Sequence, residues 1–179
     1  AGWAFLEIGS NANTTYGVDA GSATAGNTYS YGATSNTERA LGSLSSSNLQ
    51  SRWGASFVNN SGSVITSLTI TYVGEQWRLG ATSGRLDTLN FKYSTDATSL
   101  STGTWIDENS LDFTSPKVSG SAGSLDGNAL GNQTSITFTI SGLNITSGSG
   151  FWIRWDDIDA TGSDDGLSID DFTISYNGV

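Results

Sequence analysis

Two segments, Leu68-Thr-Ile-Thr-Tyr-Val73 and Ile136-Thr-Phe-Thr-Ile140, alternate apolar and polar side chains residue by residue. Successive side chains of a strand point to opposite faces of its sheet, so each segment predicts a strand with one core face and one threonine face. Short apolar segments recur between Gly, Ser and Asn along the whole chain, and none has the spacing of an amphipathic helix. The sequence therefore predicts an all-β fold, a jelly-roll β-sandwich of two antiparallel sheets.

The expected strands are nine in number and are joined by short turns. They lie at residues 3–8, 28–31, 52–58, 64–73, 76–79, 88–93, 134–140, 151–155 and 167–176. Residues 115–133 contain few large apolar side chains and are expected to form a long surface loop. A length of 179 residues suits one domain, so we expect a single sandwich domain over residues 1–179.

The composition excludes several classes of function. A net charge of −10 disfavours nucleic acid as a partner, because binding phosphates requires a basic surface. No long apolar segment is present, so no membrane insertion is expected. The chain has no His and no Cys, and it contains no Gly-x-Ser-x-Gly motif or Walker loop. We therefore expect a domain that is not an enzyme. Its four Glu residues are scattered along the chain, so the sequence leaves open whether two of them form a catalytic pair.

The densest local charge lies between residues 156 and 171, which hold seven acidic side chains (positions 156, 157, 159, 164, 165, 170 and 171). Crowded carboxylates repel each other unless a cation or solvent screens them, and calcium is a cation that accepts six to eight oxygen ligands. The sequence thus predicts a calcium site, with a solvated acidic turn as the alternative. The candidate ligands are Asp157, Asp159, Asp164, Asp165 and Asp170.

A second candidate site is aromatic. In the segment Phe151-Trp-Ile-Arg-Trp155, alternation places one set of side chains in the core and the other set on the opposite face. An exposed indole stacks on a sugar ring while a neighbouring Arg bonds the hydroxyls. The predicted platform for a carbohydrate consists of Trp77, Arg78, Trp152 and Arg154. The alternative is that these Trp side chains fill the core and the Arg side chains pair with carboxylates.

Seven segments carry a resemblance to a known type of domain. They are Trp3-Ala-Phe-Leu-Glu7, Tyr29-Ser-Tyr-Gly32, Glu38-Arg-Ala-Leu-Gly-Ser43, Gly74-Glu-Gln-Trp-Arg-Leu-Gly80, Leu89-Asn-Phe-Lys-Tyr-Ser-Thr-Asp96, Gly103-Thr-Trp105 and Phe151-Trp-Ile-Arg-Trp-Asp-Asp157. Together they resemble a jelly-roll accessory domain of large secreted bacterial proteins, found near extracellular nuclease and lamin-tail modules. The segment Asp165-Gly-Leu-Ser-Ile-Asp-Asp-Phe-Thr-Ile174 is similar to the last strand of MAM-like and cleaved-adhesin jelly rolls.

The resemblance implies a jelly-roll sandwich and a location outside the cell or at its surface. Acidic residues near the last strand help to hold a structural calcium in the MAM-like relatives, and Asp165 and Asp170 occupy the matching positions. Those relatives often begin with an acidic strand ahead of a pair like Gly2-Trp3, and we expect that strand to be absent here or cut away. A sandwich without it has an open sheet edge, through which we expect self-association.

Three functions follow from these observations. The leading hypothesis is a non-catalytic extracellular module that binds a carbohydrate or another cell-surface ligand, with calcium ordering its loops. The alternative is a structural or adhesive subunit of an extracellular filament or matrix. A third hypothesis is an accessory domain that serves a catalytic domain of the same precursor.

Overall fold

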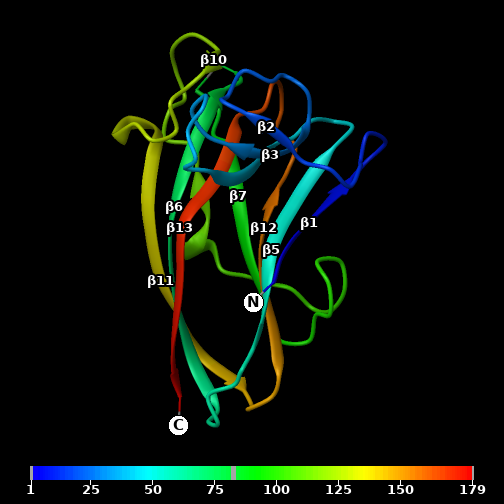
Figure 1. Cartoon of the computed structure of the whole chain (residues 1–179), viewed down its shortest axis with the longest axis vertical. Coiled ribbons are helices and arrows are strands. Elements are labelled where there is room, and N and C mark those ends of the chain that lie inside the picture. Colours follow the sequence, from blue (N-terminus) through cyan, green and yellow to red (C-terminus); the bar gives the residue numbers. More distant parts are fainter. Residues whose placement is uncertain (1, 82–83, 179) are drawn as a thin grey trace.

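Two β-sheets pack face to face in the computed structural model, which describes residues 2–81 and 84–178 (Figure 1). Sheet A has the strand order β1 (Gly2–Ile8), β5 (Gln50–Val58), β12 (Gly150–Asp157), β7 (Thr88–Ser94) and β8 (Ile106–Asp107), with β9 (Phe113–Thr114) also on β7. Sheet B has the order β10 (Gly123–Ser124), β6 (Ile65–Leu79), β13 (Gly166–Gly178), β4 (Ala40–Leu44), β3 (Asn27–Tyr31) and β2 (Gly17–Asp19), with β11 (Gln133–Ile145) also on β6.

These two sheets confirm the prediction of an all-β sandwich of jelly-roll type. Among the strand pairs of the described residues, only β2 and β3 run parallel. The only helical elements in the described residues are two single-turn 3₁₀ segments, η1 (Asn109–Leu111) and η2 (Leu130–Asn132). None of the described helices is long and apolar enough to cross a membrane. The segment 115–133, expected to be a loop, contains β10 and η2.

The main core lies between the two sheets and is built from aromatic side chains. Trp155 of β12 packs edge-on against Tyr72 of β6, with ring centroids 5.1 Å apart, and against Phe91 of β7, at 5.2 Å. Trp53 of β5 is fully buried beside them. The strands that carry these residues are central in their sheets, which is why alternation in the sequence located them correctly.

A second, smaller core lies on the outer face of sheet B. Its members are Tyr29, Tyr31, Ala40, Leu44 and Trp77. Thr28 points to the opposite face, because its hydroxyl contacts the Ser51 hydroxyl of sheet A at 2.7 Å. The rings of Tyr31 and Trp77 stack with centroids 6.0 Å apart. Here, sheet B is therefore buried on both of its faces.

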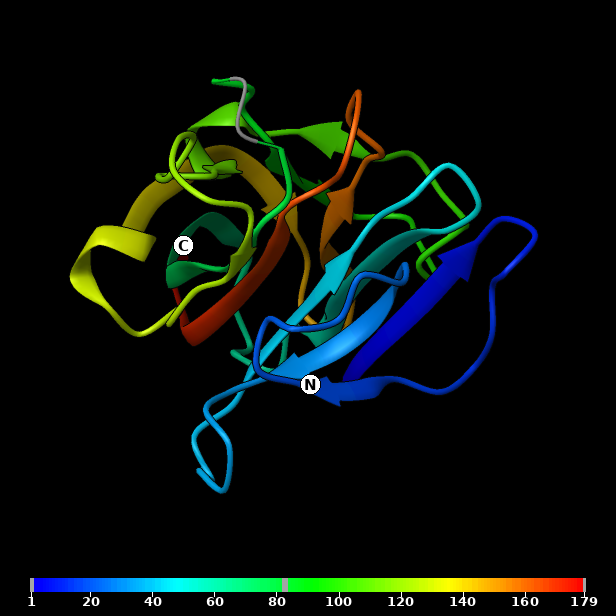
Figure 2. The same cartoon turned by 90° about the horizontal axis from the view of Figure 1, so that it is seen from above.

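The segments before β3 and after β10 cover this second core. A Cβ at Gly21 would lie 1.9 Å from the carbonyl oxygen of Trp77, and its φ of +87° also favours glycine. Across from it, the amide of Leu125 donates to the same carbonyl oxygen at 2.8 Å. Seen from above, the turn between β3 and β4 extends away from the body of the sandwich (Figure 2).

Candidate functional site

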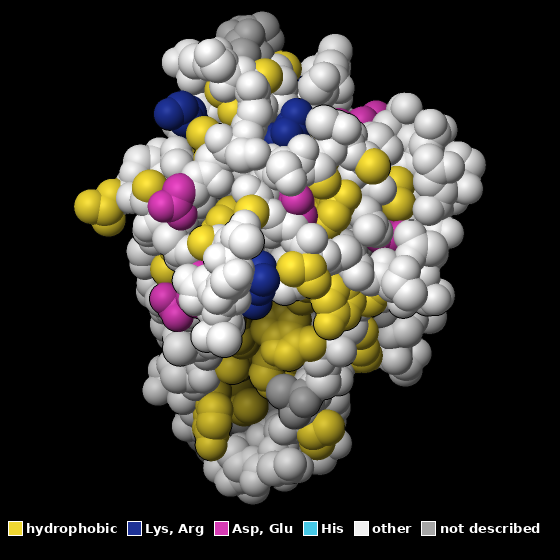
Figure 3. All heavy atoms as spheres, turned by 45° about the horizontal axis from the view of Figure 1, so that its top comes forward, with side chains coloured by type: hydrophobic (Ala, Val, Ile, Leu, Met, Phe, Trp, Pro, Cys, Tyr) yellow, Lys and Arg dark blue, Asp and Glu magenta, His cyan; other side chains and the backbone are white. Residues whose placement is uncertain are grey.

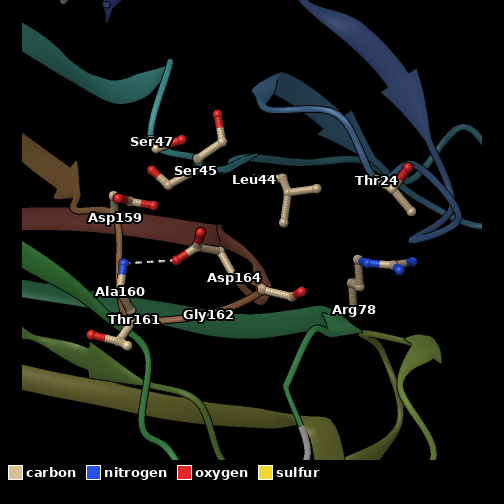
Figure 4. Close-up of a pocket in the computed structure, with 12 residues that line it drawn as sticks. Thr24, Leu44, Ser45, Ser47, Arg78, Asp159, Ala160, Thr161, Gly162 and Asp164 are labelled. Atoms are coloured by element: carbon tan, nitrogen blue, oxygen red, sulfur yellow. Dashed lines mark hydrogen bonds between the residues drawn. The ribbon is translucent and has the colours of Figure 1, made fainter.

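A pocket of about 440 Å³ lies at the end of the sandwich where β12 passes into β13 (Figure 4). One wall is the connection between these strands, and the other is formed by the end of β4 and the turn after it. Its lining residues are Thr24, Leu44, Ser45, Ser46, Ser47, Arg78, Asp159, Ala160, Thr161, Gly162, Ser163 and Asp164. The lining is dominated by hydroxyl groups, with two carboxylates and one guanidinium group, and it contains no aromatic ring.

Arg78 supplies the positive charge of the pocket. Its Nη1 donates to the carbonyl oxygen of Gly21 at 3.2 Å, and the side chain is half-buried. These contacts leave other guanidinium N–H groups of Arg78 free to donate to a ligand. On the opposite wall, the Ser45 hydroxyl donates to the backbone carbonyl of Asp157 at 2.9 Å, which fixes the position of that wall.

The connection between β12 and β13 is held in place by Asp164 and Arg85. Asp164 Oδ1 accepts a hydrogen bond from the amide of Ala160 at 2.8 Å, so the carboxylate closes its own turn. Arg85 Nη2 donates to the carbonyl oxygen of Ser163, and its Nη1 lies 3.6 Å from Asp164 Oδ1. Burial, helped by the nearby Asp87 and Asp159 carboxylates, raises the pKa of Asp164 to about 7.

Three more carboxylates lie behind the pocket, each about 1% exposed: Asp87, Asp157 and Asp165. Asp157 accepts from the Ser43 hydroxyl, and burial raises its pKa well above the ordinary value. Asp165 Oδ1 accepts from the amide of Gly80 at 2.7 Å. The contact between Asp157 and Ser43 joins the two sheets, and that between Asp165 and Gly80 links the start of β13 to the end of β6, so these side chains have a structural role.

The predicted calcium ligands are not brought together, which corrects the predicted set. Asp159 and Asp164 line the pocket, while Asp157 and Asp165 are buried behind it and engaged in internal hydrogen bonds. Asp170 lies apart from them, opposite Val73 of β6. Its acidic neighbours come from other parts of the sequence.

Within the described part of the chain, one group of three acidic side chains brings one carboxylate oxygen from each within 4.8 Å of the other two: Glu38, Glu75 and Asp170. Glu75 is 2% exposed, and its Oε2 accepts from Trp77 Nε1 at 2.8 Å. Glu38 Oε2 accepts from Asn128 Nδ2 at 2.7 Å, whereas its Oε1 is buried and accepts no hydrogen bond. We call these three residues the acidic trio.

The acidic trio is electrostatically unbalanced. None of the ion pairs formed by the described residues includes any of its three carboxylates. Burial raises the pKa of Glu75 to about 7 and that of Asp170 to about 6. Sequence reasoning missed Glu38 and Glu75, because each is a single acidic residue that only the pairing of distant strands brings to Asp170.

The predicted aromatic platform does not form, and this corrects the second expectation. Trp77 is 1% exposed and lies in the second core, while Arg78 beside it faces the pocket. Trp152 and Arg154 belong to sheet A instead. Arg154 is buried, with its Cζ 3.9 Å from the centroid of the Trp105 ring. Of the four predicted residues, only Arg78 lies at the pocket.

Comparison with known proteins gives no family for this chain. No family model matches the sequence, and no curated protein matches it. Among solved structures, the chain is similar to the enzymatically active domain of tailspike protein 4 from bacteriophage CBA120, with a TM-score of 0.47 and 6% identity. That alignment covers 98% of this chain and 19% of the tailspike chain, so this chain spans about a fifth of its length.

Two carbohydrate-binding modules are also similar in structure. TmCBM61, solved in complex with β-1,4-galactotriose, has a TM-score of 0.40 and 8% identity, over 80% of this chain and 74% of that chain. A CBM4 structure has a TM-score of 0.37 and 12% identity, over 78% of this chain and 69% of that chain. Identities and TM-scores this low transfer no ligand, so the function must be argued from the site itself.

Proposed function

We propose that this chain is a non-catalytic, extracellular binding module whose pocket takes a carbohydrate. The observation that carries the proposal is the lining of the pocket, where hydroxyls, two carboxylates and the Arg78 guanidinium group converge on one space of about 440 Å³. Each sugar hydroxyl both donates and accepts hydrogen bonds, so it needs acceptors such as Asp159 and donors such as Arg78 within reach.

A binding role accounts for the pocket better than catalysis does. Its serine hydroxyls have no imidazole to activate them, because the chain contains no His. Asp164 accepts a hydrogen bond from the Ala160 amide and forms an ion pair with Arg85. Arg78 donates to the backbone carbonyls of Gly21 and Ser22. The extracellular location is supported by the resemblance of the sequence motifs to those of secreted bacterial proteins.

A glycan array tests the proposal with the whole chain and two variants. Arg78→Ala and Asp159→Asn should each lower the signal for the bound glycan at least tenfold, because each removes a charged hydrogen-bonding group from the pocket. Lys117→Ala, an exposed residue outside the pocket lining, is the control and should bind as the wild type does. Binding that is unchanged in both pocket variants would contradict the proposed site.

Calcium belongs to the same proposal, but at the acidic trio. Three carboxylates provide the hard oxygen ligands that calcium prefers, and the buried Glu38 Oε1 has no hydrogen-bond donor. A cation there would neutralise charges that no Lys or Arg of the described residues pairs. It would connect β6 and β13 to the residues ahead of β4, and its role would be structural.

Thermal unfolding in calcium and in EDTA tests this part. A hundredfold excess of calcium over its dissociation constant stabilises by about 2.7 kcal/mol, which for a chain of this length raises the Tm by about 6 °C. Terbium, which replaces calcium at oxygen sites, should luminesce on excitation of Trp77, whose indole contacts Glu75. Glu38→Gln should abolish both effects, and equal effects in the wild type and this variant would place the ion elsewhere.

The second candidate function is that of a structural subunit in an extracellular filament or matrix. One observation favours it: from Asp170 to Gly178, no strand of the described residues pairs with one side of β13.

A further inference from the structure

The last strand in the structure, β13, has a partner strand on both sides over its first part and on one side over the rest. From Gly166 to Ile169 it pairs with both β4 and β6. From Asp170 to Gly178 it pairs only with β6, and no strand of the described residues occupies its other side. Across the opening, β1 is the edge strand of sheet A and pairs only with β5. The backbone groups on the free side of β13 are therefore available to another strand.

The opening between these two edges is mostly apolar, with Arg39, Asp170 and Asp171 at one end of it. Figure 3 shows a hollow of hydrophobic side chains on this face, largely free of charge in its deepest part. A space of about 250 Å³ adjoins Trp3 and Phe172, and a second of about 350 Å³ adjoins Ile174 and Tyr176. Trp3 is 45% exposed and Tyr176 is 55% exposed. Large aromatic surfaces at an unpaired strand are an interaction site rather than a solvent face.

The sequence of the free edge is close to a palindrome. Residues 171–177 read Asp-Phe-Thr-Ile-Ser-Tyr-Asn. If two copies of this segment pair antiparallel with Ile174 opposite Ile174, then Phe172 faces Tyr176 and Thr173 faces Ser175. The pairs within residues 172–176 then join side chains of one kind: aromatic with aromatic, hydroxyl with hydroxyl, and aliphatic with aliphatic. Such pairs stabilise antiparallel strands.

We propose that a second copy of this chain covers this edge, with the two β13 strands paired about a two-fold axis at Ile174. The contact would extend sheet B across two molecules and cover Phe172, Ile174 and Tyr176 in each of them. A two-fold contact of this kind closes on itself, so it gives a dimer, and a filament would need a second contact elsewhere on the chain. The inference does not depend on the carbohydrate pocket, which is lined by none of these residues.

Charge also favours a second copy at this place. The chain carries a net charge of −10, so most contacts between two copies bring carboxylates together. Residues 172–178 contain no charged side chain. Asp171 at one end would face Asn177 of the second copy, whose amide group can donate to a carboxylate. The edge is thus an uncharged surface on an acidic molecule.

A cysteine experiment tests the register, because the chain has no Cys of its own. Thr173 and Ser175 are exposed, so Thr173→Cys and Ser175→Cys should fold normally. Directly opposite residues have Cα atoms about 4.5–5.5 Å apart, within the range of a disulfide, whereas diagonal residues are about 7–8 Å apart. Mild oxidation of a mixture of the two variants should give a disulfide-linked dimer, and either variant alone should give far less.

The matched control is a mixture of Thr137→Cys and Thr139→Cys, two exposed positions on β11, the edge strand on the other side of β6. This mixture should not link. Light scattering of the wild-type chain supplies the second measurement, and the mass should rise to that of a dimer with concentration. A mass that stays monomeric at millimolar concentration would overturn the proposal, and so would equal linking in the control mixture.

Discussion

Replacing Asp164 by Asn should make the protein more stable at neutral pH and leave its stability nearly unchanged in acid. Burial raises the pKa of Asp164 from 3.8 to about 7 in the folded chain. Above pH 4 the unfolded chain therefore loses this proton first, and the folded chain keeps it until about pH 7. Because the native state binds more protons in this interval, the free energy of unfolding falls as the pH rises. Asn has the shape of the protonated carboxyl group and does not titrate.

The size of the effect follows from the pKa. Each pH unit between 3.8 and about 7 is worth about 1.4 kcal/mol, which sets an upper limit of about 4 kcal/mol. Asp164 lies in the wall of an open pocket and interacts with Asp159, so solvent and proton sharing reduce this figure. We expect the variant to gain about 2 kcal/mol over the wild type between pH 4 and pH 7.5. The hydrogen bond from Ala160 survives, since the Asn carbonyl oxygen accepts it.

Urea unfolding of both proteins at about pH 4 and pH 7.5 measures this gain. The control is Asp126→Asn, an exposed position whose replacement should change the stability equally at both pH values. A variant that is destabilised by the same amount at both pH values would refute the reasoning, because the ion pair with Arg85 would then outweigh the burial of the carboxylate.

Three further predictions concern the frame of the sandwich, each measured by urea unfolding. A Cβ at Gly54 would lie 1.9 Å from the Ile153 carbonyl oxygen, so Gly54→Ala should cost about 3 kcal/mol, and a cost below 1 kcal/mol would contradict this packing. Tyr72→Phe removes the 2.6 Å hydrogen bond to the Leu111 carbonyl and should cost about 1.5 kcal/mol; no loss would mean that water replaces the hydroxyl. Leu89→Ala leaves a cavity in the main core and should cost about 3 kcal/mol, a figure that an unchanged midpoint would rule out.

The fold was predictable wherever one strand face is apolar and the other polar. Residues 68–73 and 136–140 show this alternation, and both lie in strands of sheet B. A single strand, β6, replaces the two strands expected at residues 64–73 and 76–79. Gly74 separated them in the sequence, but in the structure Phe113 packs where its Cβ would be, so the strand continues through it. The short strand Ala40–Leu44 was missed, because both of its faces are largely buried and its sequence does not alternate.

The site was predictable only in its local part. The acidic segment pointed to Asp159 and Asp164. Arg78 was predicted as part of an aromatic platform, but it lies in the pocket with these two residues. Glu38 and Glu75 could not be found, because residues so far apart in sequence meet only through strand pairing. Trp77 was misplaced because alternation assigns a side chain to a face of the sheet without revealing that another segment covers that face.

The two-sided burial of sheet B has a consequence for how the molecule opens. The peptide groups of β4 and of the adjoining part of β13 lie between two cores, so their amide hydrogens should exchange with solvent only through global unfolding. We expect the two covering segments, around Gly21 and after β10, to open without global unfolding, which would expose Trp77 while Trp53 and Trp155 stay enclosed. Fluorescence quenching and amide exchange would then report two separate free energies of opening within one sandwich, the smaller of them beside the pocket.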